Sequence, residues 1–270
     1  MTGDRLSEFC IDPRFGRVAF GDDPAGYHAT RPGYPDWVFE TLRVQCHLAP
    51  GTATIEIGAG TGKATRRLLD FGADPLLAIE PDARLAAFIR TSIQDTALSV
   101  KVSTFEDATL ERASFDLGVC ATAFHWLDED MALTKVADLL RPGGWWAMVW
   151  NVFGDDSRRD AFHDATTVLL NGPSRRPAGL RDIPFSLDTE ARVAAMERTG
   201  AFDDIAYQAS AWTLVLDAEQ TLALYASFSN ITIRPDREAI LAELGRIARD
   251  VFHGRVTRNM ITCLYTARRR

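Results

Sequence analysis

Residues 55–65 read IEIGAGTGKAT, and the three glycines of this stretch, Gly58, Gly60 and Gly62, decide the fold. They follow a short run of β-forming residues, TATIEIG (52–58), and precede a run with helical spacing, KATRRLLDFG (63–72). A glycine-rich turn between a strand and a helix is typical of sheets that bind nucleotides or nucleotide-like cofactors. The same glycines also suit a tight turn without a ligand, because glycine adopts backbone angles that other residues avoid.

The spacing excludes a triphosphate-binding loop. Such a loop has a glycine five positions before its Gly-Lys pair and a Ser or Thr after the lysine, because the hydroxyl binds magnesium. Here Ile57 stands at the first position and Ala64 follows Lys63. We therefore expect that this protein is not a nucleoside triphosphatase.

The dinucleotide fingerprint GxGxxG fits only in part. Its third glycine lets the helix pack closely on the strand, but that position is Lys63. The acid Glu56, two positions before Gly58, has the wrong charge to face a pyrophosphate. It suits a ligand with a positive charge, such as an ammonium or a sulfonium.

The segment EIGAGTG resembles motif I of the class I S-adenosylmethionine (SAM) dependent methyltransferases. The resemblance implies that SAM is the cofactor and S-adenosylhomocysteine the product. It also implies that the segment contacts the cofactor through Glu56, Gly58, Ala59, Gly60 and Gly62.

Glu80 ends the second predicted strand, 22 positions after Gly58, and Pro81 follows it. A carboxylate there can accept hydrogen bonds from both ribose hydroxyls of the cofactor, each worth roughly 1.5–3 kcal/mol. A dehydrogenase also has an acid near this position, and an acid near a helix start is favoured by the helix dipole in any case. Pro81 is expected to border the same ligand.

The stretch FDLGVCATAFHWLD (115–128) carries the most specific resemblance. It is similar to the fourth-strand motif of small-molecule methyltransferases related to trans-aconitate methyltransferase, and YHATRPGYP (27–35) and LRPGG (140–144) extend the similarity over roughly residues 25–152. The resemblance implies cofactor contacts from Ala121, Phe124 and His125. It also implies Arg31 as the partner of the methionyl carboxylate and Tyr27 as a lid.

The segment STFED (103–107) follows the third predicted strand and, by the same resemblance, borders the adenine. The backbone N–H of Phe105 and the side chain of Glu106 or Asp107 are the expected contacts. Thr104 stands where an aspartate is often found in the family, so either acid can take its place. The alternative is that these acids cap a helix.

His125 is the one candidate catalytic residue, because an imidazole can remove a proton from a substrate near neutral pH. The same side chain can instead pack against the methionine part of the cofactor or cap a helix. No His/Asp/Glu cluster has metal-ligand spacing, so we expect no metal site.

The order of strand-like and helix-like runs predicts an α/β fold. We expect a Rossmann-like, mostly parallel seven-stranded sheet with helices on both faces, an antiparallel last strand and a helical cap. The run RPGG (141–144) is expected to turn the chain into the strand WWAMVWN (145–151). The predicted divisions are an N-terminal helical arm or lid (1–48), the SAM-binding half of the core (49–152), an inserted cap segment (153–186), and the rest of the core (187–270) with a helical cap at 217–252.

Composition restricts the partners. The chain has 270 residues, 46% hydrophobic content and a formal charge of −7, and its terminal Arg268-Arg269-Arg270 reads as a solvated tail. We expect a small-molecule substrate and no nucleic acid, since the Pro-Pro-aromatic run of nucleobase methyltransferases is missing after the fourth strand. Without a signal peptide or a membrane-length apolar run, the prediction is a cytoplasmic protein that does not bind membranes. Four separated cysteines read as free thiols.

The leading hypothesis is therefore a SAM-dependent methyltransferase of a metabolite or natural product. The alternatives are an NAD(P)-dependent oxidoreductase and a SAM-binding protein without turnover. The aromatic residues Trp212, Tyr225 and Phe228 either line a substrate pocket or belong to a core, and the core is favoured. The acceptor, the methylated atom and the oligomeric state stay open.

Overall fold

The computed structural model describes residues 20–153, 158–170 and 183–270. These residues divide into two compact units. The core unit comprises Pro32–Asn151, Phe185–Ser210 and Thr262–Arg270. The helical unit comprises the described residues of Met1–Arg31, Val152–Pro184 and Ala211–Ile261. Cys10 and much of the predicted inserted segment lie outside the described residues.

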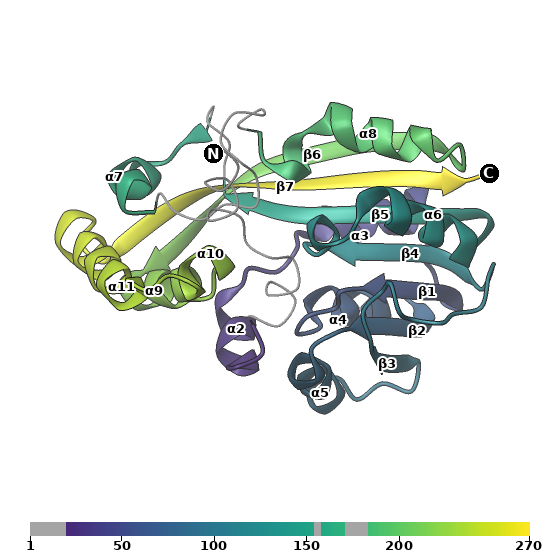
Figure 1. Ribbon diagram of the computed structural model, residues 1–270, viewed down its shortest axis with the longest axis horizontal. Coiled ribbons are helices and arrows are strands. Elements are labelled where there is room, and N and C mark those ends of the chain that lie inside the picture. Colours follow the sequence, from purple (N-terminus) through teal and green to yellow (C-terminus); the bar gives the residue numbers. More distant parts are fainter. Residues whose placement is uncertain (1–19, 154–157, 171–182) are drawn as a thin grey trace, which may run out of the picture. The chain divides into compact units, whose positions relative to one another are not determined.

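A seven-stranded sheet with the order β3-β2-β1-β4-β5-β7-β6 organises the fold (Figure 1). Strands β1 to β5 are joined by parallel pairs, and the arrows of β5 and β7 point in opposite directions. This confirms the predicted fold class. The strands are β1 Thr52–Ile57, β2 Ala73–Glu80, β3 Leu98–Val102, β4 Phe115–Ala121, β5 Leu140–Phe153, β6 Phe202–Asp217 and β7 Arg255–Arg269.

The helices of the core unit start where the sequence supplies a cap. The side chains of Asp82, Asp128 and Asp188 each accept a backbone N–H from the first turn that follows them, which satisfies a donor without an intrahelical partner. The α-helices are α3 Asp36–Gln45, α4 Lys63–Asp70, α5 Ala83–Ser92, α6 Glu129–Leu139 and α8 Thr189–Arg198, with 3-10 turns η2 Phe124–Trp126 and η4 Phe185–Leu187.

The centre of the sheet is buried on both faces. All six residues of β1 are buried, as expected for a parallel strand with helices packed around the sheet. Side chains of α3, α4 and the central strands form one apolar cluster that includes Phe39, Leu68 and Trp145. The sheet therefore offers a rigid base for the loops at its carboxyl edge.

Three local expectations were wrong. The RPGG sequence at 141–144 lies inside β5, which begins at Leu140. No helix follows residues 104–107, so the helix-capping alternative for these acids is wrong. Arg268 and Arg269 belong to β7 instead of a solvated tail, and the Arg269 guanidinium donates to the carbonyl of Leu140.

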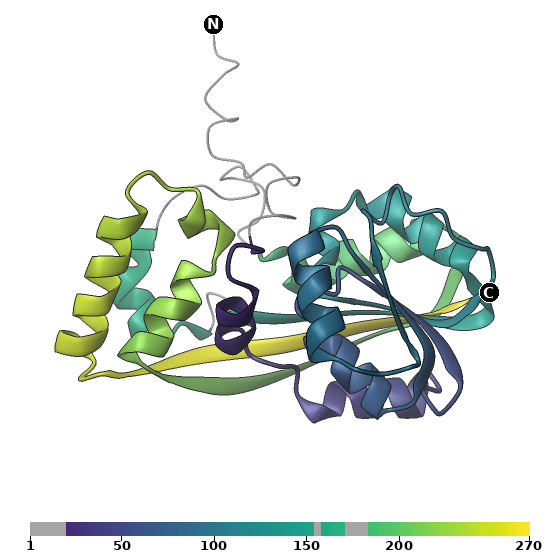
Figure 2. The same ribbon diagram turned by 90° about the horizontal axis from the view of Figure 1, so that it is seen from below.

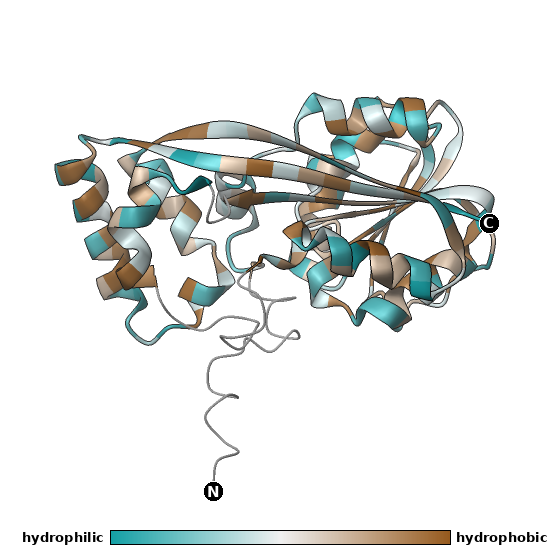
Figure 3. Cartoon of the chain, turned by 90° about the horizontal axis from the view of Figure 1, so that it is seen from above, coloured by the Kyte–Doolittle hydropathy of each residue, from teal (hydrophilic) through white to brown (hydrophobic). Residues whose placement is uncertain are grey.

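Helices make up most of the helical unit, and several of them contact one another (Figure 2). Polar and apolar residues mix along them, as the colouring of Figure 3 shows. Tyr225 is buried in the apolar cluster of this unit and Phe228 packs against it, so both are core residues. The elements are α2 Pro24–Thr30, α7 Ala161–Leu170, α9 Ala218–Ala226, α10 Ser229–Thr232, α11 Arg237–Arg246 and the π-helical turn η5 Ile247–Val251.

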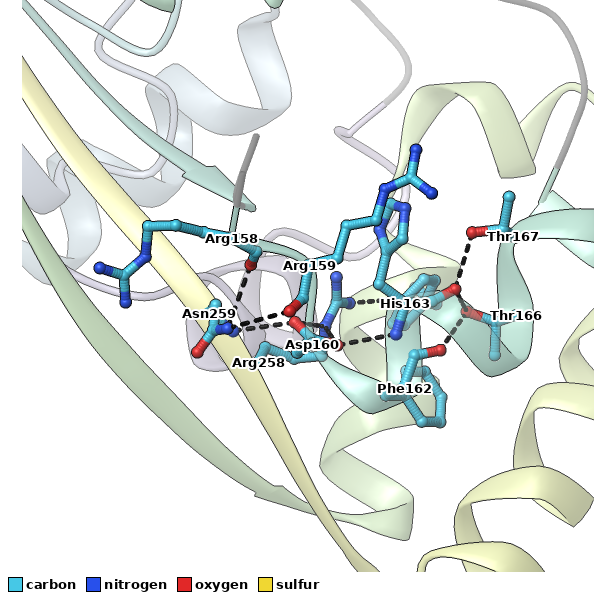
Figure 4. Close-up of polar contacts among 10 residues, drawn as sticks. Arg158, Arg159, Asp160, Phe162, His163, Thr166, Thr167, Arg258 and Asn259 are labelled. Atoms are coloured by element: carbon cyan, nitrogen blue, oxygen red, sulfur yellow. Dashed lines mark hydrogen bonds and ion pairs between the residues drawn. The ribbon is translucent and has the colours of Figure 1, made fainter. Parts of the chain in front are cut away.

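A buried ion pair lies within the helical unit (Figure 4). The Arg258 Nε contacts both oxygens of Asp160, at 3.1 and 2.9 Å, and its guanidinium also donates to the Tyr225 hydroxyl. The Asp160 carboxylate accepts the backbone N–H groups of His163 and Asn259 as well. The two charges neutralise each other inside the unit.

Among the described residues, no helix combines the length and apolar character that a membrane span requires. Cys46, Cys120 and Cys263 are buried free thiols, as the sequence predicted for them. No group of three or more His, Cys, Asp or Glu side chains within the described ranges is arranged to hold a metal ion.

Candidate functional site

The glycine loop connects β1 to α4 and is folded against the end of β2. Gly58, Gly60 and Gly62 have φ of 70°, 59° and 81°, in the region that other residues rarely adopt. The N–H groups of Gly58 and Ala59 both donate to the carbonyl of Ile79, at 2.9 and 3.1 Å. The loop therefore presents its backbone at the carboxyl edge of the sheet, as the sequence predicted.

The three glycines serve different purposes. A Cβ on Gly58 would lie 2.5 Å from the Cβ of Ala123, and one on Gly62 would lie 2.9 Å from Ile93. These two glycines allow close packing within the protein. A Cβ on Gly60 would meet no protein atom within 4 Å, so this position is open to a bound molecule.

Glu56 is a buried carboxylate, 1% exposed, next to the last residue of β1. The Thr65 hydroxyl donates to its Oε2 at 2.6 Å, whereas Oε1 accepts no hydrogen bond from the described residues. Burial raises the pKa of Glu56 to about 8, and the nearby Glu80 adds to the increase. A buried carboxylate oxygen without a donor is costly unless a ligand supplies one.

Glu80 joins the glycine loop to the start of α5. Its Oε2 accepts the Gly60 N–H at 2.7 Å and its Oε1 accepts the Asp82 N–H at 2.9 Å. Burial raises the pKa of Glu80 to about 7. Pro81 lies half-buried between Glu80 and the helix cap Asp82. Each carboxylate oxygen accepts more than one hydrogen bond, so Glu80 can hold the loop and still accept from a diol.

The segment after β3 forms a turn beside Glu80, because the Ser103 N–H donates to the Glu80 carbonyl. The Thr104 hydroxyl donates to the Asp107 carboxylate at 2.7 Å and so orients this acid. Phe105 is buried, and Glu106 is half-buried. The turn thus brings the predicted adenine-facing residues to the same edge as the loop.

The sequence did not predict that Lys135 contacts the turn after β3. This α6 side chain donates to the carbonyls of Phe105, Glu106 and Ala108 at 2.6, 2.9 and 2.8 Å. Its ammonium also lies 5.0 Å from the Phe105 ring centroid. A lone lysine at helical spacing gives no sequence signal for such a role.

The end of β4 carries a strained residue next to the loop. Thr122 has φ of 57°, which is rare for a β-branched residue and is often found at functional sites. Its N–H donates to the Val149 carbonyl, and its hydroxyl is 2.8 Å from the Tyr34 hydroxyl. This anchoring places Ala123 against Gly58.

The residues from Ala121 to His125 follow the same strand end. Ala121 is half-buried, while the Phe124 ring is fully buried and packs on Trp146 at 5.7 Å between centroids. His125 lies half-buried in η2, and Trp150 Nε1 donates to its Nδ1 at 3.2 Å. The helix-capping alternative for His125 is wrong, because Asp128 caps α6.

Tyr27 and Arg31 belong to the helical unit, so the site described above is built without them. Within that unit, the Arg31 guanidinium donates to the Ser227 carbonyl at 2.7 Å. It also lies 5.1 Å from the ring centroid of Tyr27 and 4.7 Å from that of Phe228. Their predicted cofactor contacts stay predictions.

Residues 55–148, which include the glycine loop and β4, match the family model described as methyltransferase domain. The match covers about a third of the chain. This segment of the chain is therefore similar to a methyltransferase domain.

Similar proteins carry the same description. The chain is 33% identical over 138 residues to an uncharacterised methyltransferase of Mycobacterium bovis, covering 50% of this chain and 52% of that protein. It thus spans about half the length of the relatives that it matches at this level of identity. An uncharacterised methyltransferase-like protein of Schizosaccharomyces pombe is 26% identical over 250 residues, which is 92% of both chains.

A solved structure shares the fold. Phosphoethanolamine N-methyltransferase 2 of Haemonchus contortus, in complex with phosphomonomethylethanolamine and S-adenosylhomocysteine, superimposes with a TM-score of 0.57 at 14% identity. The similarity covers 92% of this chain and 57% of that protein. At this identity it is evidence for the fold alone.

Proposed function

We propose that this protein transfers a methyl group from SAM to a small-molecule acceptor. The observation that supports the proposal most directly is the hydrogen bond between the Gly60 N–H and Glu80. It joins the open glycine of the loop to the acid at the end of β2, which are the two predicted contacts for the methionine and ribose parts of one ligand.

The residues of the site fit this cofactor. The free Oε1 of Glu56 provides a buried acceptor for a donor that carries positive charge. The space beside Gly60 lets a ligand approach the backbone, and Glu80 has lone pairs left for ribose hydroxyls. The turn at Thr104–Asp107 would border the adenine.

A small molecule is the proposed acceptor because the sequence around His125 resembles that of the trans-aconitate methyltransferase group. The net charge of −7 also disfavours a polyanionic substrate. The cytoplasmic location stays a prediction.

When bound, SAM supplies a methyl group on a sulfonium sulfur, which an acceptor lone pair attacks in line with the carbon–sulfur bond. The task of the protein is then to hold the methyl donor still and align the acceptor, and such alignment can account for about 7–11 kcal/mol of the barrier. The glycine loop and Glu80 would orient the donor. The rigid end of β4, with Thr122 and His125, would border the acceptor.

Isothermal titration calorimetry with SAM and S-adenosylhomocysteine tests the proposal. We expect micromolar binding by the wild type and a loss of at least about 100-fold in Gly60→Val, because the new side chain fills the open position at a backbone φ that valine avoids.

The matched control is Gly200→Val. Gly200 has φ of 65° and also has no atom within 4 Å of an added Cβ, but it ends α8 away from the loop. It should bind like the wild type. Equal losses in both variants, or NADH binding in place of SAM, would contradict the proposal.

A further inference from the structure

The sequence left open whether His125 is a base, and the structure constrains the proton on its ring. Trp150, on β5, donates its indole N–H to His125 Nδ1 at 3.2 Å. An indole nitrogen can only donate, so Nδ1 must be the acceptor and carry no proton. A neutral imidazole has a single N–H, which is then on Nε2.

The neighbouring packing holds both rings in place. Trp150 is 3% exposed, and Phe185 of η4 packs on its indole and on the His125 ring, at 6.0 and 6.4 Å between centroids. The Arg192 guanidinium covers Phe185, 3.4 Å from its ring centroid, while forming a 2.9 Å ion pair with Glu129. A rotation of the His125 ring would disturb this whole stack.

We infer that His125 serves the proposed methyl transfer as a hydrogen-bond donor through Nε2–H, with Trp150 as the positioning residue that selects this tautomer. The inference rests on the proposed function for its role and on the Trp150 contact for its chemistry. A general base at Nε2 needs a free lone pair there, and in this tautomer Nε2 carries the proton instead. The acceptor must therefore attack with a lone pair that is already available, or lose its proton to another group.

Nuclear magnetic resonance tests the tautomer directly. In protein labelled with ¹⁵N at His and Trp, long-range correlations distinguish a protonated ring nitrogen from an acceptor, and a nitrogen–nitrogen coupling across the bond identifies the Trp150–His125 pair. His125→Gln assigns the signals, since the chain has five histidines. We expect a proton on Nε2, none on Nδ1, and the coupling, near neutral pH with and without S-adenosylhomocysteine.

Trp150→Phe keeps an aromatic ring and removes the N–H. We expect the Nδ1 signal of His125 to shift towards the value of a tautomer mixture, because a hydrogen bond of ordinary strength biases the equilibrium about tenfold. Trp145→Phe is the matched control: it lies on the same strand and is buried, and its indole nitrogen has no partner among the described residues. It should leave the His125 signals unchanged.

Several results would overturn the inference: a proton on Nδ1, a missing coupling in the wild type, or an unchanged Nδ1 signal in Trp150→Phe. If Trp150→Phe does not fold, the nitrogen–nitrogen coupling in the wild type still shows whether Trp150 donates to His125 Nδ1. The ligand-free spectra are independent of the proposed function, whose failure would appear separately as absent calorimetric binding of S-adenosylhomocysteine.

Discussion

One pair of buried ionisable side chains in the helical unit differs from one pair in the core unit in how its charges are compensated. In the helical unit, Arg258 and Asp160 are 4% and 8% exposed and form an ion pair. In the core unit, Glu56 and Glu80 are 1% and 3% exposed, and neither forms an ion pair with a described residue. A paired buried charge serves the fold, whereas an uncompensated pair of carboxylates costs stability and is typical of a binding site.

The largest effect on stability is expected from breaking the ion pair between Arg258 and Asp160. Arg258→Met should lower the free energy of unfolding by about 3–5 kcal/mol, because it leaves Asp160 buried without its counterion. Urea denaturation measures this change. Arg246→Met removes a surface pair with Glu243 and should change stability little. A similar, small effect in both variants would show that the buried pair is not essential to the unit.

An effect of intermediate size is expected on the pH dependence of stability. The carboxyls of Glu56 and Glu80 have pKa values raised to about 8 and about 7, so the folded state holds protons that the unfolded state has lost above about pH 4.5. The contribution of these two carboxyls to the stability of the ligand-free protein should therefore be fully present below about pH 4.5 and be lost as the pH rises to about 8. Glu56 accepts a hydrogen bond from Thr65 and interacts electrostatically with Glu80 and with the Cys120 thiol.

Glu56→Gln should reduce this loss and stabilise the ligand-free protein by roughly 1–3 kcal/mol at pH about 8, the usual cost of an unsatisfied buried group. Thermal unfolding across the pH range measures it. The exposed Glu111→Gln is the control and should follow the wild-type curve. A wild-type curve that rises with pH over the same interval would contradict the assignment.

The smallest effect concerns ligand affinity. Glu80→Gln keeps one acceptor oxygen, which can serve the Gly60 N–H or the Asp82 N–H but not both, and it removes the charge. Charge-assisted hydrogen bonds are about twice as strong as neutral ones. We expect roughly tenfold weaker S-adenosylhomocysteine binding by calorimetry. Asp128→Asn, at a helix cap elsewhere in the core unit, should leave the affinity unchanged. Unaltered binding by Glu80→Gln would mean that Glu80 only supports the loop.

The sequence predicted the parts of the site that depend on local order. Gly58 to Gly62 and Glu80 each lie at the end of a strand, and parallel strands end at the same edge, so their proximity followed from the alternation of strands and helices. The segment 103–107 was placed correctly after the third strand, although no helix follows it. The RPGG run was interpreted as a turn because two glycines and a proline disfavour strands. In the structure it is an irregularity within β5, since the β4–β5 pairing passes from Leu140 to Trp145 and Gly143 has φ of 81°.

The contacts that depend on side chains distant in sequence could not be predicted. Trp150 is 25 residues from His125, and Tyr34 is 88 residues from Thr122. Tryptophans in an apolar run indicate a core, and nothing in the local pattern shows which one aims its N–H at an imidazole. The left-handed backbone of Thr122 has no sequence signal either, since threonine rarely adopts it.

The hydrogen bonds from Lys135 to three backbone carbonyls have a consequence for the order in which the protein folds during synthesis. The turn after β3 takes its shape from an ammonium that lies 27 to 30 residues later in the chain. Until α6 has been synthesised and docked, those carbonyls lack their donor. The edge that would receive the adenine is therefore completed after the strands beneath it, and a nascent chain that ends before Lys135 should be unable to capture the nucleoside.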